Sequence, residues 1–304
     1  MANGSRHAAY YVEETVYGTI PSNPSMTKIR HTGCTIGMEK DTLSSAEIRD
    51  DRNIADFRMG QNKAGGNIEM EALNDAGFED FLAAVLCGAW DTNVLKNGTT
   101  RKSFSILRYF GDLGTGNKPY HVSKGLEFAS VDFKVSANAL VTASFETVAQ
   151  TYEAGETKPT GATLGSATTT TPMDAFTGAI LEGGSPVAVV TELSFKIDNN
   201  MDRRFVIGSR NTIRPSVGRC NVTGSCTVYF ESGTMLDKFL SEATSSLSVQ
   251  LAAGTDTLTF LFPKIRYTGG KPDVSGEGPI TLTMPFQAVY DGTAGAAIQV
   301  TRSA

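Results

Sequence analysis

The chain has 304 residues, a formal net charge of −5, 9% aromatic residues and 19% charged residues. This length suits one large domain or two ordinary modules, and the composition lies outside the low-hydrophobicity, high-charge range of disordered chains. The negative balance argues against a nucleic-acid-binding surface, which needs clustered lysine and arginine. No stretch approaches the roughly 18 to 20 apolar residues of a membrane span, and the N-terminus lacks a signal peptide's apolar core, so we expect folding in the cytoplasm that makes the protein, without a membrane contact.

The first part of the chain predicts an N-terminal arm and a first module. Residues 1–30 are expected to form an extended arm, because Pro21 and Pro24 oppose a helix. Residues 31–150 are expected to form the module. It begins with alternating strand-like residues at 34–41, continues through a long polar stretch, and reaches a second strand at 67–71.

A helix and two further strands complete the first module. Apolar residues at 78, 81, 82, 85 and 86 give the stripe of an amphipathic helix, which Asn74 or Asp75 can cap. Period-2 alternation at 131–135 and 141–145 predicts strands with one buried face and one polar face.

The same order of elements returns about 158 residues later. Residues 151–188, rich in Thr, Gly and Pro, are expected to be a linker or surface loop. In residues 189–304, strands at 191–198 and 225–231 flank a second polar stretch. A helix follows, with Leu236, Phe239, Leu240 and Ala243 on its apolar face and Thr234 or Ser232 as cap, and then a strand at 280–286.

This repetition predicts a mainly β fold built from tandem duplicated modules, each an antiparallel β structure, a sandwich or barrel-forming sheet, with one α-helix packed on it. The alternative is that any two segments of mixed α and β structure resemble each other at this level of detail. The matching order of strand, long polar stretch, strand, helix and strand in both halves favours duplication.

The two long polar stretches are predicted to be arms that become ordered against another subunit, or else flexible surface loops. A two-stranded ribbon buries little by itself and is marginal in water. The first arm leans acidic and the second is basic, so they can pair head-to-tail between copies, as a ring requires. The candidate arm residues are Ile48, Arg49, Asp50, Asp51, Arg52, Ile54, Phe57, Arg58, Arg203, Arg204, Phe205, Arg210 and Arg214.

The sequence offers no catalytic, metal or cofactor site, and we predict that the protein is not an enzyme. His7, His31 and His121 are far apart and in no zinc-binding spacing. The four cysteines are expected to be reduced. The Gly-rich run at 111–118 fails as a phosphate loop, because its lysine does not directly follow the last glycine and no helix pattern follows. A Gly-rich turn is expected instead.

Over nearly its whole length the sequence resembles the tail tube proteins of long-tailed, non-contractile bacteriophages. Residues 12–24 resemble the family's N-terminal arm, residues 47–60 with the strand and helix after them its hairpin–strand–helix unit, and residues 265–291 its closing strands. The resemblance implies a β-sandwich flanked by a helix, stacked rings of subunits in the virion, and a lumen through which DNA is ejected. It implies a tape measure protein in the lumen during assembly, and tail terminator and tail tip proteins as partners.

With that resemblance, the polar faces of the strands become candidate lumen walls. They are net acidic in both modules, and an acidic wall repels phosphate, so DNA can slide without specific binding. An ordinary solvated sheet face is the alternative. The candidate lumen-facing acidic residues are Glu39, Glu69, Glu71, Asp132, Glu146, Glu192, Asp198 and Glu231.

The resemblance also implies that each module gives four strands to the wall, and that family members with one module per chain reach 24 strands with six subunits. Three chains of two modules would supply the same 24 strands, so we expect three subunits in the ring. A hexamer with one module at the lumen is the alternative. Two other functions stay open at this point: another virion β-protein, such as a capsid decoration or tail-tip subunit, and a carbohydrate-binding or hydrolytic β-sandwich. Sugar binding would favour clustered exposed aromatic residues, whereas the chain has a single Trp, Trp90.

Overall fold

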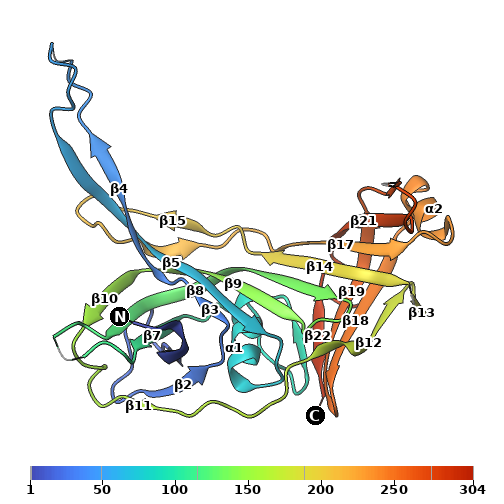
Figure 1. The fold of residues 1–304 in the computed structure, drawn as a ribbon, viewed down its shortest axis with the longest axis horizontal. Coiled ribbons are helices and arrows are strands. Elements are labelled where there is room, and N and C mark those ends of the chain that lie inside the picture. The colour runs from blue at the N-terminus through green and yellow to red at the C-terminus, as the bar shows by residue number, and fades with distance from the viewer. Residues whose placement is uncertain (1, 49, 115, 188, 275, 304) are drawn as a thin grey trace.

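The computed structural model describes residues 2–48, 50–114, 116–187, 189–274 and 276–303, and only the backbone of 176 and 177. Within these residues it is mainly β, as predicted, with two α-helices and a 3-10 turn at Gly4–Arg6. Ladders connect 20 strands, and β15 and β16 form a separate pair. Figure 1 shows an elongated body from which one hairpin projects.

The main sheet runs across both halves of the chain. Its first four strands, in spatial order, are β4 (Gly37–Ser44), β5 (Phe57–Glu71), β9 (Thr142–Ala149) and β8 (Tyr120–Ser136). The next four are β14 (Val190–Asp198), β17 (Asn221–Tyr229), β21 (Thr281–Ala288) and β20 (Lys271–Asp273). Every neighbouring pair is antiparallel, so eight strands from two halves form one surface.

A second layer packs beneath each half. Under the first half, β1 (His7–Glu13) pairs with β2 (Ser25–Ile29) and β7 (Phe104–Phe110), and β7 and β10 (Thr151–Gly155) pair with the N-terminal part of β8. Under the second half, β18 (Ser245–Ala253) pairs with β19 (Asp256–Tyr267) and β12 (Asp174–Glu182), while β22 (Gln299–Arg302) joins β19 to β6 (Val94–Lys96).

Several predicted connecting segments are paired strands. Residues 1–30 hold β1 and β2, and residues 151–188 hold β10, β11 (Thr163–Leu164), β12 and β13 (Ser185–Pro186). β11 runs parallel to β2, and β3 (Gly33–Cys34) precedes β4 and pairs with β5. The placement of domain boundaries within this connected structure stays a prediction.

The two halves share an order of ladders. In the first half the order is β4, β5, β9, β8 and β7, with the helix after β5. In the second half it is β14, β17, β21, β19 and β18, with the helix after β17. A tandem duplication predicts such a match, although the duplication itself stays a prediction.

The two helices differ in burial and in capping. α1 (Ala76–Val85) is capped by Asp75, whose side chain accepts from Phe78 N, as predicted, and it buries seven residues. α2 (Thr234–Leu240) has no fully buried residue. Its predicted caps are wrong: Gly233 occupies the N-cap position without a side-chain bond, and the Ser232 hydroxyl instead bonds the hydroxyl of Thr234, the first helical residue.

A continuous aromatic core joins the two halves. Phe78 of α1 packs edge-on against Phe133 and Phe145, at ring-centroid distances of 6.2 and 5.7 Å. Phe133 of β8 also stacks on Phe195 of β14 at 4.6 Å, and Phe195 contacts Phe260 at 5.1 Å. Aromatic pairs of this kind stabilise the fold beyond what their buried area contributes. The side chains on the opposite face of the sheet are mainly polar.

Candidate assembly surfaces

The predicted acidic residues gather on one face of the main sheet. Strand register places Glu69, Ser144, Asp132 and Lys196 opposite one another across β5, β9, β8 and β14. Because side chains alternate between faces, the strand positions two residues away share this face. It carries Glu39, Glu69, Glu71, Asp132, Glu146, Glu192 and Asp198, all exposed or half-buried, whereas Glu231 is exposed just beyond the end of β17.

The charge on this face is uneven. The acidic groups lie on β4, β5, β9, β8 and β14, and lysines interrupt them. One such lysine, Lys196, pairs with Asp132 at 3.4 Å across the junction of the two halves. β17 and β21 present mainly uncharged hydroxyl groups, including those of Thr223 and Thr283. Whether this face lines a lumen stays a prediction.

The first predicted arm is a projecting hairpin. β4 and β5 pair from Gly37 opposite Gly65 to Ser44 opposite Phe57, and residues 45–48 and 50–56 lie at the tip (Figure 1). The apolar arm residues Ile48, Ile54 and Phe57 are 98%, 71% and 52% exposed. Asp50, Asp51 and Arg52 are exposed too, Arg58 pairs with Asp56 at 3.1 Å, and Arg49 lies outside the described residues.

The second predicted arm is a short hairpin that packs on the first. It consists of β15 (Asp202–Arg204) and β16 (Ile213–Ser216). Arg203 donates to the Ala64 carbonyl at 2.9 Å, and Asn62 N–H donates to the Arg210 carbonyl at 2.8 Å, so this hairpin crosses the base of the first. Arg204 and Arg210 are exposed and Phe205 is half-buried.

Arg214 of this second hairpin forms an internal ion pair. Its guanidinium lies 2.6 Å from one carboxylate oxygen of Glu127, a β8 residue that is 1% exposed. Arg101 forms an ion pair with the other oxygen of the same carboxylate. The Arg214 guanidinium also lies 5.2 Å from the ring of Tyr17. Sequence reasoning missed Glu127, although an acid between Leu126 and Phe128 in a buried run was a signal for a paired charge.

A comparison with known protein families identifies the family of this chain. A family described as phage tail tube protein matches residues 4–288. The chain belongs to the phage tail tube protein family. The resemblance noted in the sequence is therefore confirmed, and the chain is a structural component of the virion tail. No curated protein matches the chain as a relative.

Family membership also establishes that the protein has a structural role. Tail tube proteins are structural, and they assemble with themselves into a tube and with other tail components. This decides against the capsid decoration, tail-tip and carbohydrate-binding alternatives. Among the described residues, no helix is long and apolar enough to cross a membrane.

The fold of this tail tube subunit brings its histidines together. His7 and His31 share a hydrogen bond of 2.7 Å, and the Phe110 ring contacts both His7 and His121. Arg108 donates to His7 Nε2, so His7 donates from Nδ1 to His31. Burial, followed by the Arg108 charge, lowers the pKa of His7 to about 4. No metal-binding group of three ligands occurs among the described residues.

The cysteines are buried or half-buried, and hydrogen bonds hold the Gly-rich run. The four cysteines are free, and burial raises the pKa of the Cys220 and Cys226 thiols to about 11 and 12. In the Gly-rich run at 111–118, the Gly116 and Lys118 amides donate to the Glu156 carboxylate at 2.8 and 3.1 Å. The described residues of this run form the predicted turn between β7 and β8.

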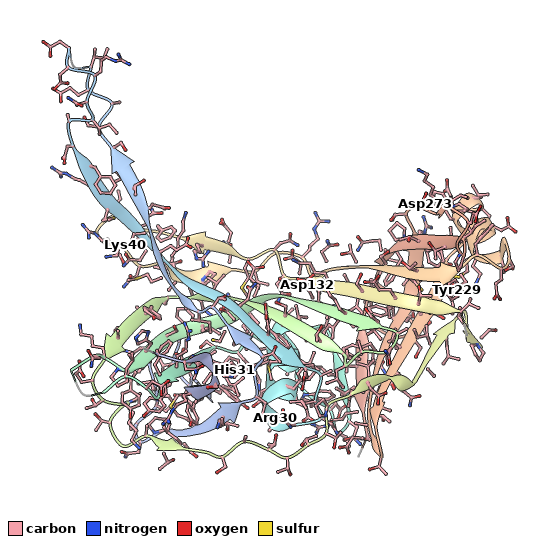
Figure 2. All side chains as sticks on the ribbon, viewed as in Figure 1. Arg30, His31, Lys40, Asp132, Tyr229 and Asp273 are labelled. Atoms are coloured by element: carbon pink, nitrogen blue, oxygen red, sulfur yellow. The ribbon has the colours of Figure 1, made fainter. Side chains whose placement is uncertain are left out.

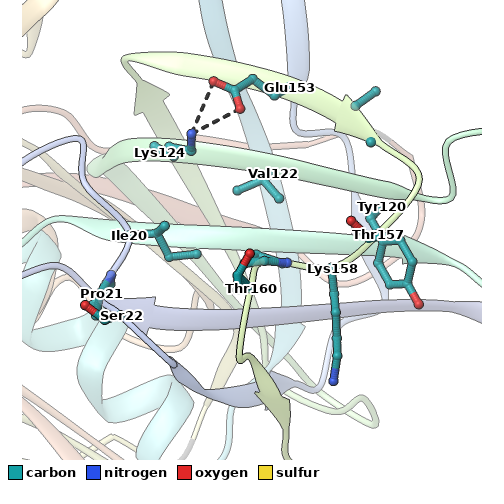
Figure 3. Close-up of a pocket in the computed structure, with 13 residues that line it drawn as sticks. Ile20, Pro21, Ser22, Tyr120, Val122, Lys124, Glu153, Thr157, Lys158 and Thr160 are labelled. Carbon is teal, nitrogen blue, oxygen red and sulfur yellow. Dashed lines mark hydrogen bonds and ion pairs between the residues drawn. The ribbon is translucent and has the colours of Figure 1, made fainter.

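A cleft lies beside the N-terminal segment. It measures about 470 Å³ and lies between Ile20, Pro21 and Ser22 on one side and β8 and β10 on the other (Figure 3). Its Lys124 pairs with Glu153 at 3.0 Å. These two charges satisfy each other.

Proposed function

We propose that the subunit polymerises into stacked rings whose main sheets form the wall of a conduit for DNA ejection. The observation that carries this proposal is the eight-stranded sheet from β4 to β20, with one face packed on the core and one polar face. Copies of such a sheet can pair edge to edge and close into a barrel.

Strand geometry favours three subunits in a ring. With strands about 4.8 Å apart and tilted by about 45°, a 24-stranded barrel has a backbone diameter of roughly 50 Å. Side chains narrow the lumen to roughly 40 Å, which admits a DNA duplex of roughly 20 Å with its water. Six chains with all eight strands in the wall would give a lumen diameter of roughly 90 Å with the same strand spacing. A hexamer would therefore have to place only one half of each chain at the lumen.

The acidic face is the proposed lumen surface. Its carboxylates repel phosphate along the path of the DNA, so the duplex passes without a binding site that holds it. During assembly the same lumen would hold a tape measure protein. Tail terminator and tail tip proteins would contact the two ends of the tube.

The first hairpin is the proposed contact to a neighbouring subunit. Its Ile48, Ile54 and Phe57 are exposed on a ribbon that has no body beneath it, and a ribbon of this kind gains stability by packing on another surface. The basic residues Arg204 and Arg210 of a neighbour's second hairpin would complement its acidic groups.

Cryo-electron microscopy of assembled tubes tests the architecture. We expect stacked rings of three chains with pseudo-sixfold symmetry and the face bearing Glu69 at the lumen. A true sixfold ring of identical chains would overturn the trimer, and a lumen lined by another face would overturn the wall.

A charge reversal tests the conduit itself. Changing Glu69, Glu71 and Glu146 to Lys should leave tubes intact and slow DNA ejection from assembled virions, because the wall would then attract phosphate. The matched control changes the exposed Glu13, Glu153 and Glu242, which lie outside this face, to Lys. Equal ejection by both triple variants would contradict the lumen assignment.

A further inference from the structure

We propose that the ring closes by antiparallel pairing of β20 with the β3–β4 edge of a second copy of the chain, in the register of the internal β8–β14 junction. This inference rests on the proposed ring. The chain already contains one junction between its halves, and its two free edges are the counterparts of the strands that form that junction.

The ladders define which strands correspond. β8 lies beside β9 with Lys134 opposite Thr142, and β20 lies beside β21 with Asp273 opposite Thr281. On its other side, β9 places Phe145 opposite Ile68 of β5. In the same way, β21 places Met284 opposite Cys226 of β17. β20 therefore corresponds to the part of β8 that carries β14.

The other edge corresponds to β14 in the same way. Leu193 of β14 lies opposite Cys226, and Cys34 of β3 lies opposite the counterpart residue, Ile68. In the internal junction, Asp132 lies opposite Lys196. Transferring each residue to its counterpart places Lys271 opposite Gly37 of the neighbouring copy. It also places Asp273 opposite Thr35, and Val274 opposite Cys34.

The two edges lie at opposite ends of the molecule. Figure 2 shows Lys40 of β4 at one end, Asp132 of the internal junction near the middle and Asp273 of β20 at the other end. Within the described residues, β4 pairs only with β5 and β20 only with β21. One chain cannot join its own edges, so the occupant of each edge is a second copy.

Apolar side chains at the two free edges are exposed, as expected if each edge lacks a neighbouring strand in the free subunit. At the internal junction Val135 and Ile197 are 7% and 0% exposed. Their counterparts at the free edges, Val274 and Met38, are 67% and 37% exposed. Pairing would bury both on the core side of the extended sheet.

Charge is complementary across the proposed junction. Internally, Asp132 on the β8 side pairs with Lys196 on the β14 side. At the free edges the signs are reversed: Lys271 stands at the position of Asp132, and Glu39 lies on the polar face two residues from Gly37. Diagonal neighbours on antiparallel strands are within reach of long side chains.

Arg108 already contacts part of this edge. Its guanidinium donates to the carbonyls of Cys34, at 2.9 Å, and Ile36. In the free subunit this side chain therefore satisfies two carbonyls of the edge, each of which can accept a second hydrogen bond.

Disulfide trapping tests the register. Directly opposed residues in antiparallel strands have Cα atoms roughly 4.5 to 5.5 Å apart, within the range of a disulfide. We therefore expect Gly37→Cys combined with Lys271→Cys to link chains covalently when assembled tubes are oxidised, giving covalent trimers on a non-reducing gel. A Cβ at Gly37 makes only an ordinary contact with its surroundings, so the substitution should be tolerated.

The matched control replaces Lys271→Cys with Thr283→Cys, which lies one strand further from the edge. It should give no linked chains, and neither should the single variants. Normal tubes with no link from Gly37→Cys/Lys271→Cys, or equal linking by the control, would overturn the register and leave the proposed tube intact. Failure of the unaltered chain to form rings would instead count against the proposed function.

A charge swap provides a second measurement should the cysteine variants fail to assemble. Glu39→Lys alone should raise the protein concentration needed for tube formation severalfold, and Glu39→Lys/Lys271→Glu should restore it. Absence of both effects in sedimentation assays at low salt would contradict the proposed contact.

Discussion

The two hairpins of this subunit occupy corresponding places in the sequence, with opposite charge, and differ in how the structure holds them. Both follow an alternating strand, and both are polar with scattered apolar residues. The first stands away from the body with Ile48 98% exposed, whereas the second is tied to it through Arg214 and the buried Glu127. Both hairpins expose apolar residues, so the ion pair between Arg214 and Glu127 is the feature that distinguishes the second hairpin from the first.

Strand length contributes to the same outcome. β4 and β5 extend their ladder well beyond the body, so main-chain hydrogen bonds hold the first hairpin in one direction. β15 and β16 pair at two positions, Asp202 with Ser216 and Arg204 with Ile213. A ladder this short needs support from elsewhere, and contacts with Ala64 and Glu127 provide it.

The largest expected effect is loss of assembly when the tip of the first hairpin is removed. Ser44 and Phe57 are paired residues, so replacing 45–56 with Asn-Gly gives a two-residue turn suited to a hairpin. We expect a folded subunit with an almost unchanged melting temperature and no tubes. Circular dichroism and negative-stain microscopy measure the two properties.

The matched control shortens the second hairpin by replacing residues 206–209, the exposed tip, with the same two-residue turn. Tubes should persist in that variant if the first hairpin is the assembly arm. Tubes formed normally without residues 45–56 would remove the basis for assigning it that role.

The next effect concerns the anchor of the second hairpin. Glu127→Gln leaves Arg101 and Arg214 without a carboxylate in a buried site. Loss of one partner from a buried ion pair costs about 3 to 5 kcal/mol. Both arginines are partly solvated, so we expect about 2 to 3 kcal/mol less free energy of unfolding in urea.

Glu153→Gln is the comparison for that measurement, since Glu153 is 62% exposed in its pair with Lys124. Exposed pairs contribute about 0 to 1 kcal/mol. Similar losses in both variants would mean that Glu127 does not anchor the hairpin.

The sequence was informative about elements and poor at contacts. Alternation predicted β14 and most of the main sheet, and the apolar stripe with Asp75 predicted α1, because periodicity reports directly on which face is buried. The α2 cap was missed because Ser, Thr and Gly near a helix start all suit the position. Which of them occupies it depends on the loop from β17.

The same limit applied to the assembly surfaces. The acidic face could be predicted from alternation, since each strand reveals its own two faces. The internal use of Arg214 could not, because Glu127 lies 87 residues away in the chain. The meeting of His7 and His31 likewise depends on the pairing of β1 with β2 and β7, and the place of His121 beside Phe110 depends on the pairing of β7 with β8. Single-sequence periodicity encodes neither pairing.

A smaller effect is expected from pH at the base of the first hairpin, where Arg108 links His7 to the Cys34 carbonyl. The pKa of His7 is about 4 in the folded chain and about 6.5 when unfolded. Between these values the unfolded chain binds more protons, so stability falls as pH is lowered through this window. Allowing for partial exposure, we expect a loss of about 1 kcal/mol from pH 7 to 5.

His7→Gln should reduce the slope of unfolding free energy against pH over this range. His31 and His121, whose pKa values burial also lowers, should preserve part of it. An unchanged slope in the variant would show that His7 is not the responsible group.

The smallest expected effect tests whether the second hairpin braces the first. Asn62 Nδ2 donates to Asn211 Oδ1 at 2.7 Å, across the point where the two hairpins meet. Asn62→Ala removes that bond and keeps the main-chain bond to Arg210, so we expect about 0.5 to 1 kcal/mol less free energy of unfolding. The control is Asn53→Ala, a change in the exposed tip. If the brace sets the direction of the first hairpin, Asn62→Ala should raise the protein concentration needed for tube formation by more than Asn53→Ala does. Equal assembly by both variants would mean that the β4–β5 ladder alone directs the hairpin.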